Sequence, residues 1–301
     1  MPHDTTRQSV IFNDLFGKPV VARFDQPDAS SDGGAVLLKA CDVRLNLTQA
    51  LANCLHDTRQ QSKVAHSFHD LIRQRVYGIA CGYEDCNDAA RIGNDPVHKM
   101  LLDRDPIAGA ALASQSTLSR FENALGPKSL MRMATALADA VVARHRKRRR
   151  GRVRRVIIKA EVVRLAGREP KDNPRFVVTN LRRVPQRVYE VVYCQRAHIE
   201  NRIKELHYGL AIDRTSCTSF WANQLRVLLT AAAYVLMQEL RWRAARSGCA
   251  AAQVTTLRER LFKLGAWVER SVRRIVIHLP DHTPWRWEWC QVARALGAAP
   301  S

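Results

Sequence analysis

Five side chains between residues 193 and 207 have types and a spacing that could act on phosphates. One helix face would carry Tyr193, Arg196, Glu200, Lys204 and His207, which recur at intervals of three or four residues. A carboxylate among cations on such a face can hold a metal ion or position a phosphodiester. The same arrangement is also an ordinary ladder of i, i+4 ion pairs on a solvent-exposed face. Spacing alone leaves both interpretations open and favours the ladder.

An apolar stripe runs along the same segment, offset by one residue. It consists of Ile199, Ile203, Leu206 and Leu210, at the i, i+4, i+7, i+11 spacing of a buried helix face. We therefore expect this helix to dock against a core, with its polar face directed toward something outside that core.

Positive charge is concentrated in the second half of this 301-residue chain, whose formal net charge is +20. Residues 1–143 hold 15 Lys/Arg and 16 Asp/Glu, whereas residues 156–301 hold 24 and 12. Between them lies a basic run of nine cations without an acid: Arg144, Arg146, Lys147, Arg148, Arg149, Arg150, Arg152, Arg154 and Arg155. Contact with phosphates releases condensed counterions, so a chain this basic most often binds a polyanion. We expect the basic run to contact DNA from an exposed helix end or linker; the alternative is a solvated linker alone.

The chain shows no pattern of a secreted or membrane protein. Its eight cysteines are scattered without the paired spacing of a zinc site, and no basic-then-apolar signal peptide opens it. The longest apolar stretch, Val227 to Met237, is shorter than the ~20 residues that a membrane span needs. These features predict reduced thiols, a cytoplasmic location and no membrane partner.

The hydrophobic pattern predicts a mainly helical first half. A small β-hairpin is expected within residues 9–24. The turn Asp32-Gly33-Gly34 should precede a helix, with Ser31 or Asp32 as its cap, and helical periodicity continues to about residue 143. Ser116 is the expected cap of a further helix over 116–122.

The second half mixes both kinds of pattern. We expect strands at 156–158, 175–179 and 271–279, and helices at 225–240 and 257–267. Trp285, Trp287 and Trp289 recur at period two, which favours a terminal strand that packs one face on the body. The alternative is that these rings stack on bases.

Two short motifs in the first half have competing interpretations. Ser114 to Glu122 could belong to a DNA-binding helix-turn-helix, but a capped core helix is slightly favoured. Tyr83 to Asp88 contains three acids that could suggest a metal site. No histidine stands nearby at ligand spacing, so a polar helix end is the preferred interpretation.

The segment 193–207 resembles the Y-x2-R-x3-E-x6-K signature of bacterial DDE transposases, with His207 in place of the final lysine. Strings from both ends of the chain are similar to one branch, the insertion-sequence family numbered thirteen-eighty: SSDGGAVLL (30–38), GYEDCND (82–88), ALASQSTLSRFEN (111–123), NPRFVVTNL (173–181) and ENRIKELHYGLAIDRTSCTSFWANQLRVLL (200–229). The resemblance implies that Glu200 is the last carboxylate of a catalytic triad, on a helix packed against an RNase H-like sheet. It places Tyr193, Arg196 and Lys204 beside DNA and makes His207 a weakened phosphate contact.

The resemblance also implies two Mg²⁺ ions held by three carboxylates, which activate a water or a 3′-OH. The first aspartate is expected directly after the strand at 156–158, but Lys159-Ala160-Glu161 follows instead. We interpret this as an in-frame deletion between Ile157 and Ile158 that removed both aspartates. Glu161 and Asp172 are acids that could approach Glu200, and the sequence leaves open whether either replaces a lost aspartate. One carboxylate cannot hold two Mg²⁺ ions, so we expect neither metal binding nor strand cleavage.

We therefore expect an α+β protein in three parts: a mainly helical N-terminal transposase domain with a small hairpin (1–143), a basic linker (144–155) and a truncated RNase H-like α/β remnant of the catalytic domain (156–301). The expected function is that of an internally deleted insertion-sequence transposase in the bacterial nucleoid. It would bind double-stranded DNA at transposon ends without catalysis, as a homo-oligomer or paired with intact transposase. The alternatives are a minimal metal-dependent nuclease and a non-specific basic nucleic-acid-binding protein.

Overall fold

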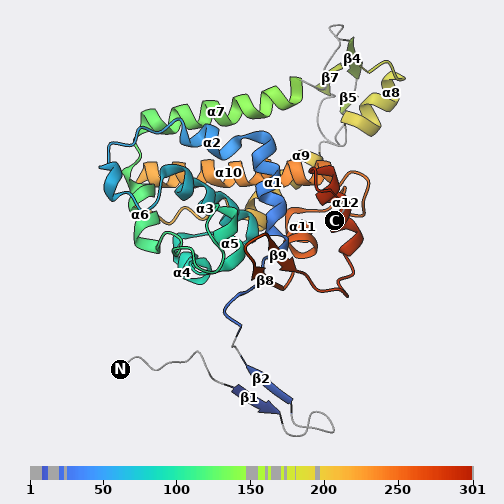
Figure 1. Cartoon of the computed structure of the whole chain (residues 1–301). Helices are drawn as coiled ribbons and strands as arrows, with labels where there is room; N and C mark the ends of the chain where they lie inside the picture. The colour runs from blue at the N-terminus through green and yellow to red at the C-terminus, as the bar shows by residue number, and fades with distance from the viewer. Residues whose placement is uncertain are drawn as a thin grey trace.

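The structure is a computed structural model that describes residues 9–12, 20–23, 26–146, 155–159, 162–163, 171–172, 175–179, 181–193 and 197–299. It is mostly helical, with a small three-stranded antiparallel sheet (Figure 1). The helices are α1 (Val36–Leu45), α2 (Leu47–Ala52), α3 (Phe68–Cys81), α4 (Ala89–Ile92), α5 (Pro96–Leu101), α6 (Gln115–Ala124), α7 (Pro127–Arg146), α8 (Pro185–Arg187), α9 (Ala197–Lys204), α10 (Phe220–Arg243), α11 (Val254–Leu257) and α12 (Arg286–Ala295). The strands are β1 (Ser9–Phe12), β2 (Val20–Arg23), β3 (Ala29–Ser30), β4 (Arg155–Lys159), β5 (Val162–Val163), β6 (Lys171–Asp172), β7 (Arg175–Thr179), β8 (Ala266–Arg270) and β9 (Ile275–His278).

Helix α10 is the centre of the main core. It begins where the Ser219 side chain accepts a hydrogen bond from the Ala222 amide, an ordinary N-cap. Its apolar residues are buried against α1, α3, α6 and α7 of the first half, and also against α11 and α12. Buried side chains from 35 to 137 and from 210 to 296 therefore form one continuous core.

The Asp32-Gly33-Gly34 turn lies in direct contact with the segment 261–266. A methyl group added to Gly34 would lie 1.6 Å from the Leu261 carbonyl oxygen, so only glycine permits this approach. The Gly33 amide donates to the Leu264 carbonyl oxygen at 2.9 Å. Asp32 accepts no capping hydrogen bond from the helix that follows, so the predicted cap is wrong at this position.

The three-stranded sheet also joins the two ends of the chain. Its order is β3-β8-β9, with antiparallel pairing throughout, and Ala29 lies opposite Trp267. Strand β3 precedes the first helix of the body and the other two strands lie close to the C-terminus, so the sheet closes the body across more than 200 residues of sequence.

Buried ion pairs add further links between the halves. Glu122 of α6 is fully buried and pairs with Arg75 of α3 at 2.8 Å and with Arg226 of α10 at 3.6 Å. Lys263 pairs with Asp32 at 2.7 Å. Arg226 and Lys263, two cations of the basic second half, are thus neutralised by acids of the first half. Part of the charge asymmetry therefore stabilises the fold.

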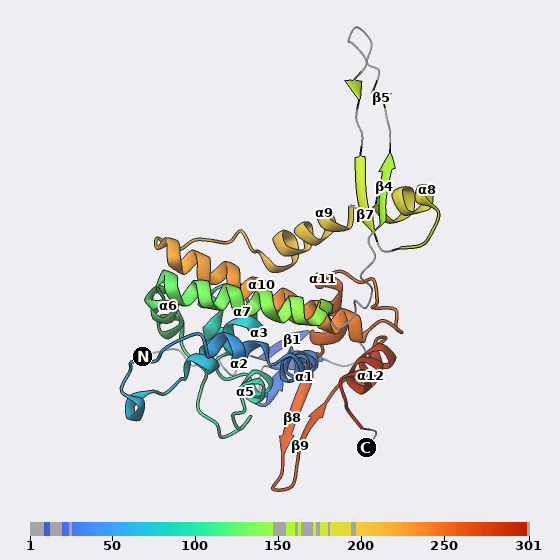
Figure 2. The same cartoon turned by 90° about the horizontal axis from the view of Figure 1, so that it is seen from above.

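The strands at residues 155–179 are placed apart from this core. β4 and β7 form an antiparallel pair in which Ile157 lies opposite Val177, and β5 pairs with β6. In both views the β4–β7 hairpin projects away from the helical body (Figures 1 and 2). Ile157, Val177, Val188 and Tyr189 form a small separate cluster, against which Tyr193 packs.

Several local predictions are confirmed. The hairpin within 9–24 is β1–β2, the strands at 156–158 and 175–179 are β4 and β7, and the helix at 225–240 is the interior of α10. Tyr83 to Asp88 is a polar helix end, because Asp85 forms a capping box with Asp88.

Other local predictions are wrong. The helix expected over 257–267 ends at Phe262, and residues 266–270 are strand β8. The strand expected over 271–279 begins only at Ile275. Helix α6 is preceded by Ser114, not Ser116, and no side chain caps it.

The tryptophan triplet is also not a strand. Trp285 precedes α12, and Trp287 and Trp289 lie within that helix. Trp289 packs against the main core, whereas Trp287 is 55% exposed, because two residues along a helix turn a side chain by slightly more than half a circle. The Arg260 guanidinium lies 3.9 Å from the centre of the Trp285 ring.

Candidate functional site

The residues of the transposase-like signature span three local structures. Tyr193 ends a π-helical segment (Val188–Tyr193), Glu200 and Lys204 lie on α9, and His207 lies in a second π-helical segment (Glu205–Gly209). Arg196 lies outside the described residues. The helical nature of 197–209 agrees with the prediction, but the wider turn after Lys204 shifts the later side chains around the axis.

Glu200 lies in the first turn of α9, and its side chain is exposed to solvent. Lys204, one turn later, is exposed as well. Tyr193 is half-buried instead, with its ring stacked on Tyr189 at a centroid distance of 5.2 Å. His207 lies 3.5 Å from the Asp213 carboxylate, which competes with any phosphate for this side chain.

The apolar stripe is buried only toward its C-terminal end. Leu210 is 1% exposed and Leu206 packs partly against the main core, but Ile203 is 50% exposed. The side chain of Ile199 lies outside the described residues. The helix therefore docks on the body by its last turn, while its first turns, which carry Glu200, extend away from it (Figure 2).

Glu205, which no sequence motif marks, fixes that docking. Its carboxylate is 5% exposed and accepts from Arg241 at 2.7 Å, from Arg202 at 3.0 Å and from the Tyr234 hydroxyl at 3.1 Å. Burial, and then the Glu205 charge, raise the pKa of Tyr234. Glu205, the carboxylate nearest to Glu200 in sequence, therefore forms ion pairs that hold α9 against α10.

The described residues around Glu200 do not fit a two-metal site. Across the described parts of the chain, the single group of three acidic, histidine or cysteine side chains close enough to share an ion is Asp32, Cys81 and His98, in the main core. Two Mg²⁺ ions need several hard oxygen ligands. Glu161 and the side chain of Asp172, the two acids that could assist Glu200, lie outside the described residues, so their approach to Glu200 stays a prediction.

The Asp32 cluster is better explained as a structural ion pair than as a metal site. Lys263 Nζ lies 2.7 Å from Asp32 Oδ1 and already supplies the positive charge, while His98 Nε2 and the Tyr83 hydroxyl lie 3.0 and 2.7 Å from Oδ2. Burial raises the pKa of Asp32, but hydrogen bonds from His98 and Lys263 outweigh it and hold that pKa below its usual value. Burial also raises the pKa of Cys81, which disfavours the thiolate that a metal would bind.

The basic run begins at the end of a helix, one of the two arrangements that the sequence left open beside a linker. Arg144 and Arg146 lie in the last turn of α7, and Arg155 is the first residue of β4, although their side chains lie outside the described residues. The cations at 147–150, 152 and 154 lie outside those residues altogether. The expectation that this run contacts DNA stays a prediction.

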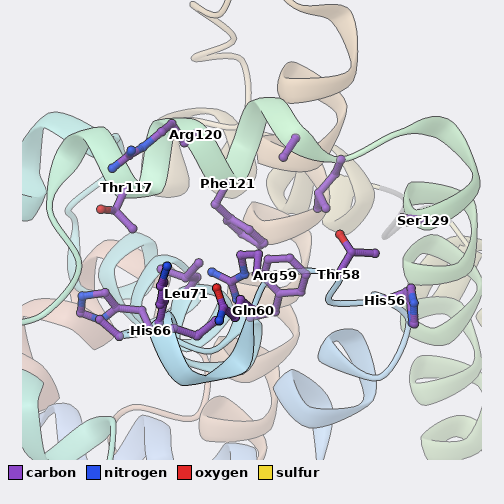
Figure 3. A pocket seen from close by; sticks show the side chains of 16 residues that line it. His56, Thr58, Arg59, Gln60, His66, Leu71, Thr117, Arg120, Phe121 and Ser129 are labelled. Carbon is purple, nitrogen blue, oxygen red and sulfur yellow. The ribbon is translucent and has the colours of Figure 1, made fainter.

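Helix α6 has one face in the core and one face on a cavity. Leu118, Phe121 and Glu122 are buried, which favours the core-helix interpretation of Ser114 to Glu122. Its other face borders a cavity of about 700 Å³ beside the loop between α2 and α3 (Figure 3). The cavity is lined by Arg59, Lys63 and Arg120, by two histidines and by hydroxyl-bearing and apolar side chains, with no acidic residue among them.

The model of the family described as "Transposase DDE domain group 1" matches residues 12–153 and 150–301. Together these segments cover nearly the whole chain. The protein belongs to this DDE transposase family. Neither the curated proteins nor the solved structures gave a significant match.

Family membership carries two general properties. DDE transposases bind DNA, and the family typically uses a divalent metal. None of the helices in the described part of this DDE transposase is long and apolar enough to cross a bilayer.

Proposed function

We propose that this protein is an internally deleted insertion-sequence transposase that binds DNA but neither cuts nor joins it. The observation that carries the proposal is the form of the family match. It consists of two segments that meet at residues 150–153, inside the basic run, rather than one continuous segment. A deletion near this point explains the division, and the similarity of residues 30–38 and 200–229 to the thirteen-eighty family supports the same origin.

The environment of Glu200 supports the loss of catalysis. Its carboxylate is exposed on a helix turn that extends from the body, and the described residues around it supply no pair of further acids. A single carboxylate leaves most of the coordination positions of two Mg²⁺ ions to water. Such ions would be weakly bound and free to leave, so the transition state of phosphoryl transfer would lack its main electrostatic stabilisation.

Exposed apolar side chains near α9 support a missing element. Val184 is 67% exposed, Val191 and Val192 are 45% exposed, and Tyr208 is 84% exposed. Ile203 is exposed as well, so apolar side chains before and after Glu200 in the sequence lack the cover that a complete RNase H-like sheet would give them. The same surface is available to a second copy or to an intact transposase.

We also propose that residues 1–143, 144–155 and 156–301 derive from three parts of an ancestral transposase. In this view the last part is the remnant of an RNase H-like domain. The core that joins 35–137 with 210–296 supports stabilisation of the remnant by packing on the first part.

DNA binding through the basic run can be measured directly. We expect the protein, in the cytoplasm of its host, to bind duplex DNA with a steep salt dependence. If all nine cations of the run neutralise phosphates, log K should fall with log[salt] by about 8. Replacing Lys147 to Arg150 by glutamine should lower that slope by about 3.6, from four contacts at 0.9 each.

The matched control replaces four exposed arginines of the helical body, namely Arg44, Arg91, Arg132 and Arg246, by glutamine. The net charge then changes equally in both variants, but only the first should flatten the slope. Equal slopes in the two variants would contradict a role for the basic run. A footprint confined to the element's terminal repeat would separate this function from non-specific binding.

Pairing with an intact transposase predicts a dominant effect in cells. Co-expression of this protein with an active member of the same family should lower the transposition frequency. The control is a variant with Lys147 to Arg150 replaced by glutamine, which should inhibit less if inhibition requires occupancy of DNA ends. An unchanged frequency would contradict the inhibitory role.

A further inference from the structure

The cavity between α6 and the α2–α3 loop has the chemistry of a single-nucleotide site. Figure 3 shows Thr117 and Arg120 on one wall and Arg59, Gln60 and His66 on the other. Phe121, Leu71 and Phe68 supply apolar surface, while Lys63 adds a third cation. Pockets of 300–1,000 Å³ hold small ligands, so about 700 Å³ admits a nucleotide but not a duplex.

Arg59 is held in a defined position in this cavity. Its guanidinium forms two hydrogen bonds with the Asp57 carboxylate, at 2.7 and 2.6 Å, and lies 4.2 Å from the centre of the Phe68 ring. The side chain still has 38% of its surface exposed. Planar arginines stacked on aromatic rings are surfaces on which unpaired bases stack.

His66 adds a directed hydrogen-bond donor. Its Nδ1 lies 2.8 Å from Arg104 Nη2, which can only donate, so Nδ1 accepts and the ring proton of the neutral imidazole is on Nε2. Burial, and then the Arg104 charge, lower the pKa of His66 and favour this neutral form. The Nε2–H group can therefore donate to a base edge or a phosphate oxygen.

We propose that this cavity binds one unpaired nucleotide at a DNA end, with its phosphates on Lys63 and Arg120 and its base on Arg59. The inference rests on the proposed DNA-binding function and deepens it: the basic run holds the duplex, while this cavity holds a nucleotide that has left it. An unpaired nucleotide fits because its base can stack on the exposed part of Arg59, whose charge Asp57 already neutralises, while its phosphates meet Lys63 and Arg120.

The test compares two labelled DNA probes on the full-length protein by fluorescence anisotropy. One is a blunt duplex, and the other is the same duplex with a four-thymidine single-stranded end. One stacked base contributes about 1–3 kcal/mol, so we expect the overhang probe to bind about tenfold more tightly. An overhang of abasic nucleotides keeps the phosphates and should lose most of that preference.

Protein variants test whether the preference for the overhang probe arises in this cavity. Lys63→Ala and Arg120→Ala change exposed side chains and should each lower affinity for the overhang about fivefold without altering the blunt duplex. The control Arg91→Ala removes a cation that is 77% exposed and outside the cavity, and should change neither probe. Equal binding of the two probes, or equal effects of Arg91→Ala and Arg120→Ala, would overturn this inference alone. Failure to bind either probe would overturn the proposed function as well.

Discussion

The substitution Asp32→Asn tests whether one buried carboxylate joins the two ends of the chain. Asp32 has no exposed surface, and it lies within hydrogen-bond distance of His98 and Tyr83 and pairs with Lys263. An asparagine fills the same volume but carries no charge. The Lys263 ammonium would then stay beside a neutral amide in a largely buried setting.

The expected cost follows from the geometry. Breaking a buried pair by removing one partner destabilises by about 3–5 kcal/mol. The Lys263 side chain is 33% exposed and can reach water in part, so we take the lower end, about 3 kcal/mol. Net stabilities are about 5–15 kcal/mol, so this is a large share of the total.

Urea unfolding followed by circular dichroism measures this cost. With an m-value of about 3 kcal/mol/M, the midpoint should fall by about 1 M. Asp281→Asn removes the carboxylate of an exposed pair with Arg286 and should cost well under 1 kcal/mol. In the double variant with Lys263→Met, part of the loss should be recovered. Equal midpoints for Asp32→Asn and Asp281→Asn would show that the buried Asp32–Lys263 pair does not stabilise the fold.

Three further predictions concern the same body. The lowered pKa of Asp32 stabilises the fold above about pH 3.9, and this contribution is lost as the pH falls through the folded pKa. The raised pKa of Lys263 stabilises the fold below about pH 10.4, and this contribution is lost as the pH rises through the folded pKa. The unfolding midpoint should therefore fall less steeply at both pH limits in Asp32→Asn than in the unchanged protein. Gly34→Ala should prevent stable folding because its methyl group would meet a backbone oxygen, whereas Gly126→Ala, with open space around it, should leave the thermal midpoint within a few degrees. Glu205→Gln should speed hydrogen exchange in α9, with a loss of about 2 kcal/mol in local stability, and unchanged exchange would contradict the role of Glu205 in docking.

Local sequence patterns predicted those elements that local interactions determine. The residues of α10 have one apolar face over many turns, and β4 and β7 are β-branched runs bounded by turn residues, so each was identified correctly. The tryptophan triplet was misread because five residues cannot distinguish a period of two from a period of 3.6. Trp289, Val292, Ala293 and Leu296 recur at helical spacing and would have indicated α12.

The long-range contacts could not be predicted from a single sequence. Glu205 and Asp32 look like ordinary polar residues beside an apolar stripe and a turn, and only the fold places Arg241 and Lys263 next to them. The cavity could not be predicted either, because Arg59 and Arg120 are 61 residues apart and line the same cavity only when α6 packs beside the α2–α3 loop. The signature spacing identified Glu200 as a candidate catalytic residue, and the structure adds its exposed position on α9.

A strand-cleavage assay measures whether the protein cuts DNA. The purified protein and its Glu200→Gln variant would be incubated with supercoiled DNA that carries the element's terminal repeats, in Mg²⁺ or Mn²⁺, at concentrations where both bind it. We predict that both retain DNA binding and that neither produces nicks above the background of a no-protein control. Metal-dependent nicking that Glu200→Gln abolishes would show that the protein is catalytic, because it would require further acids to complete a metal site around Glu200.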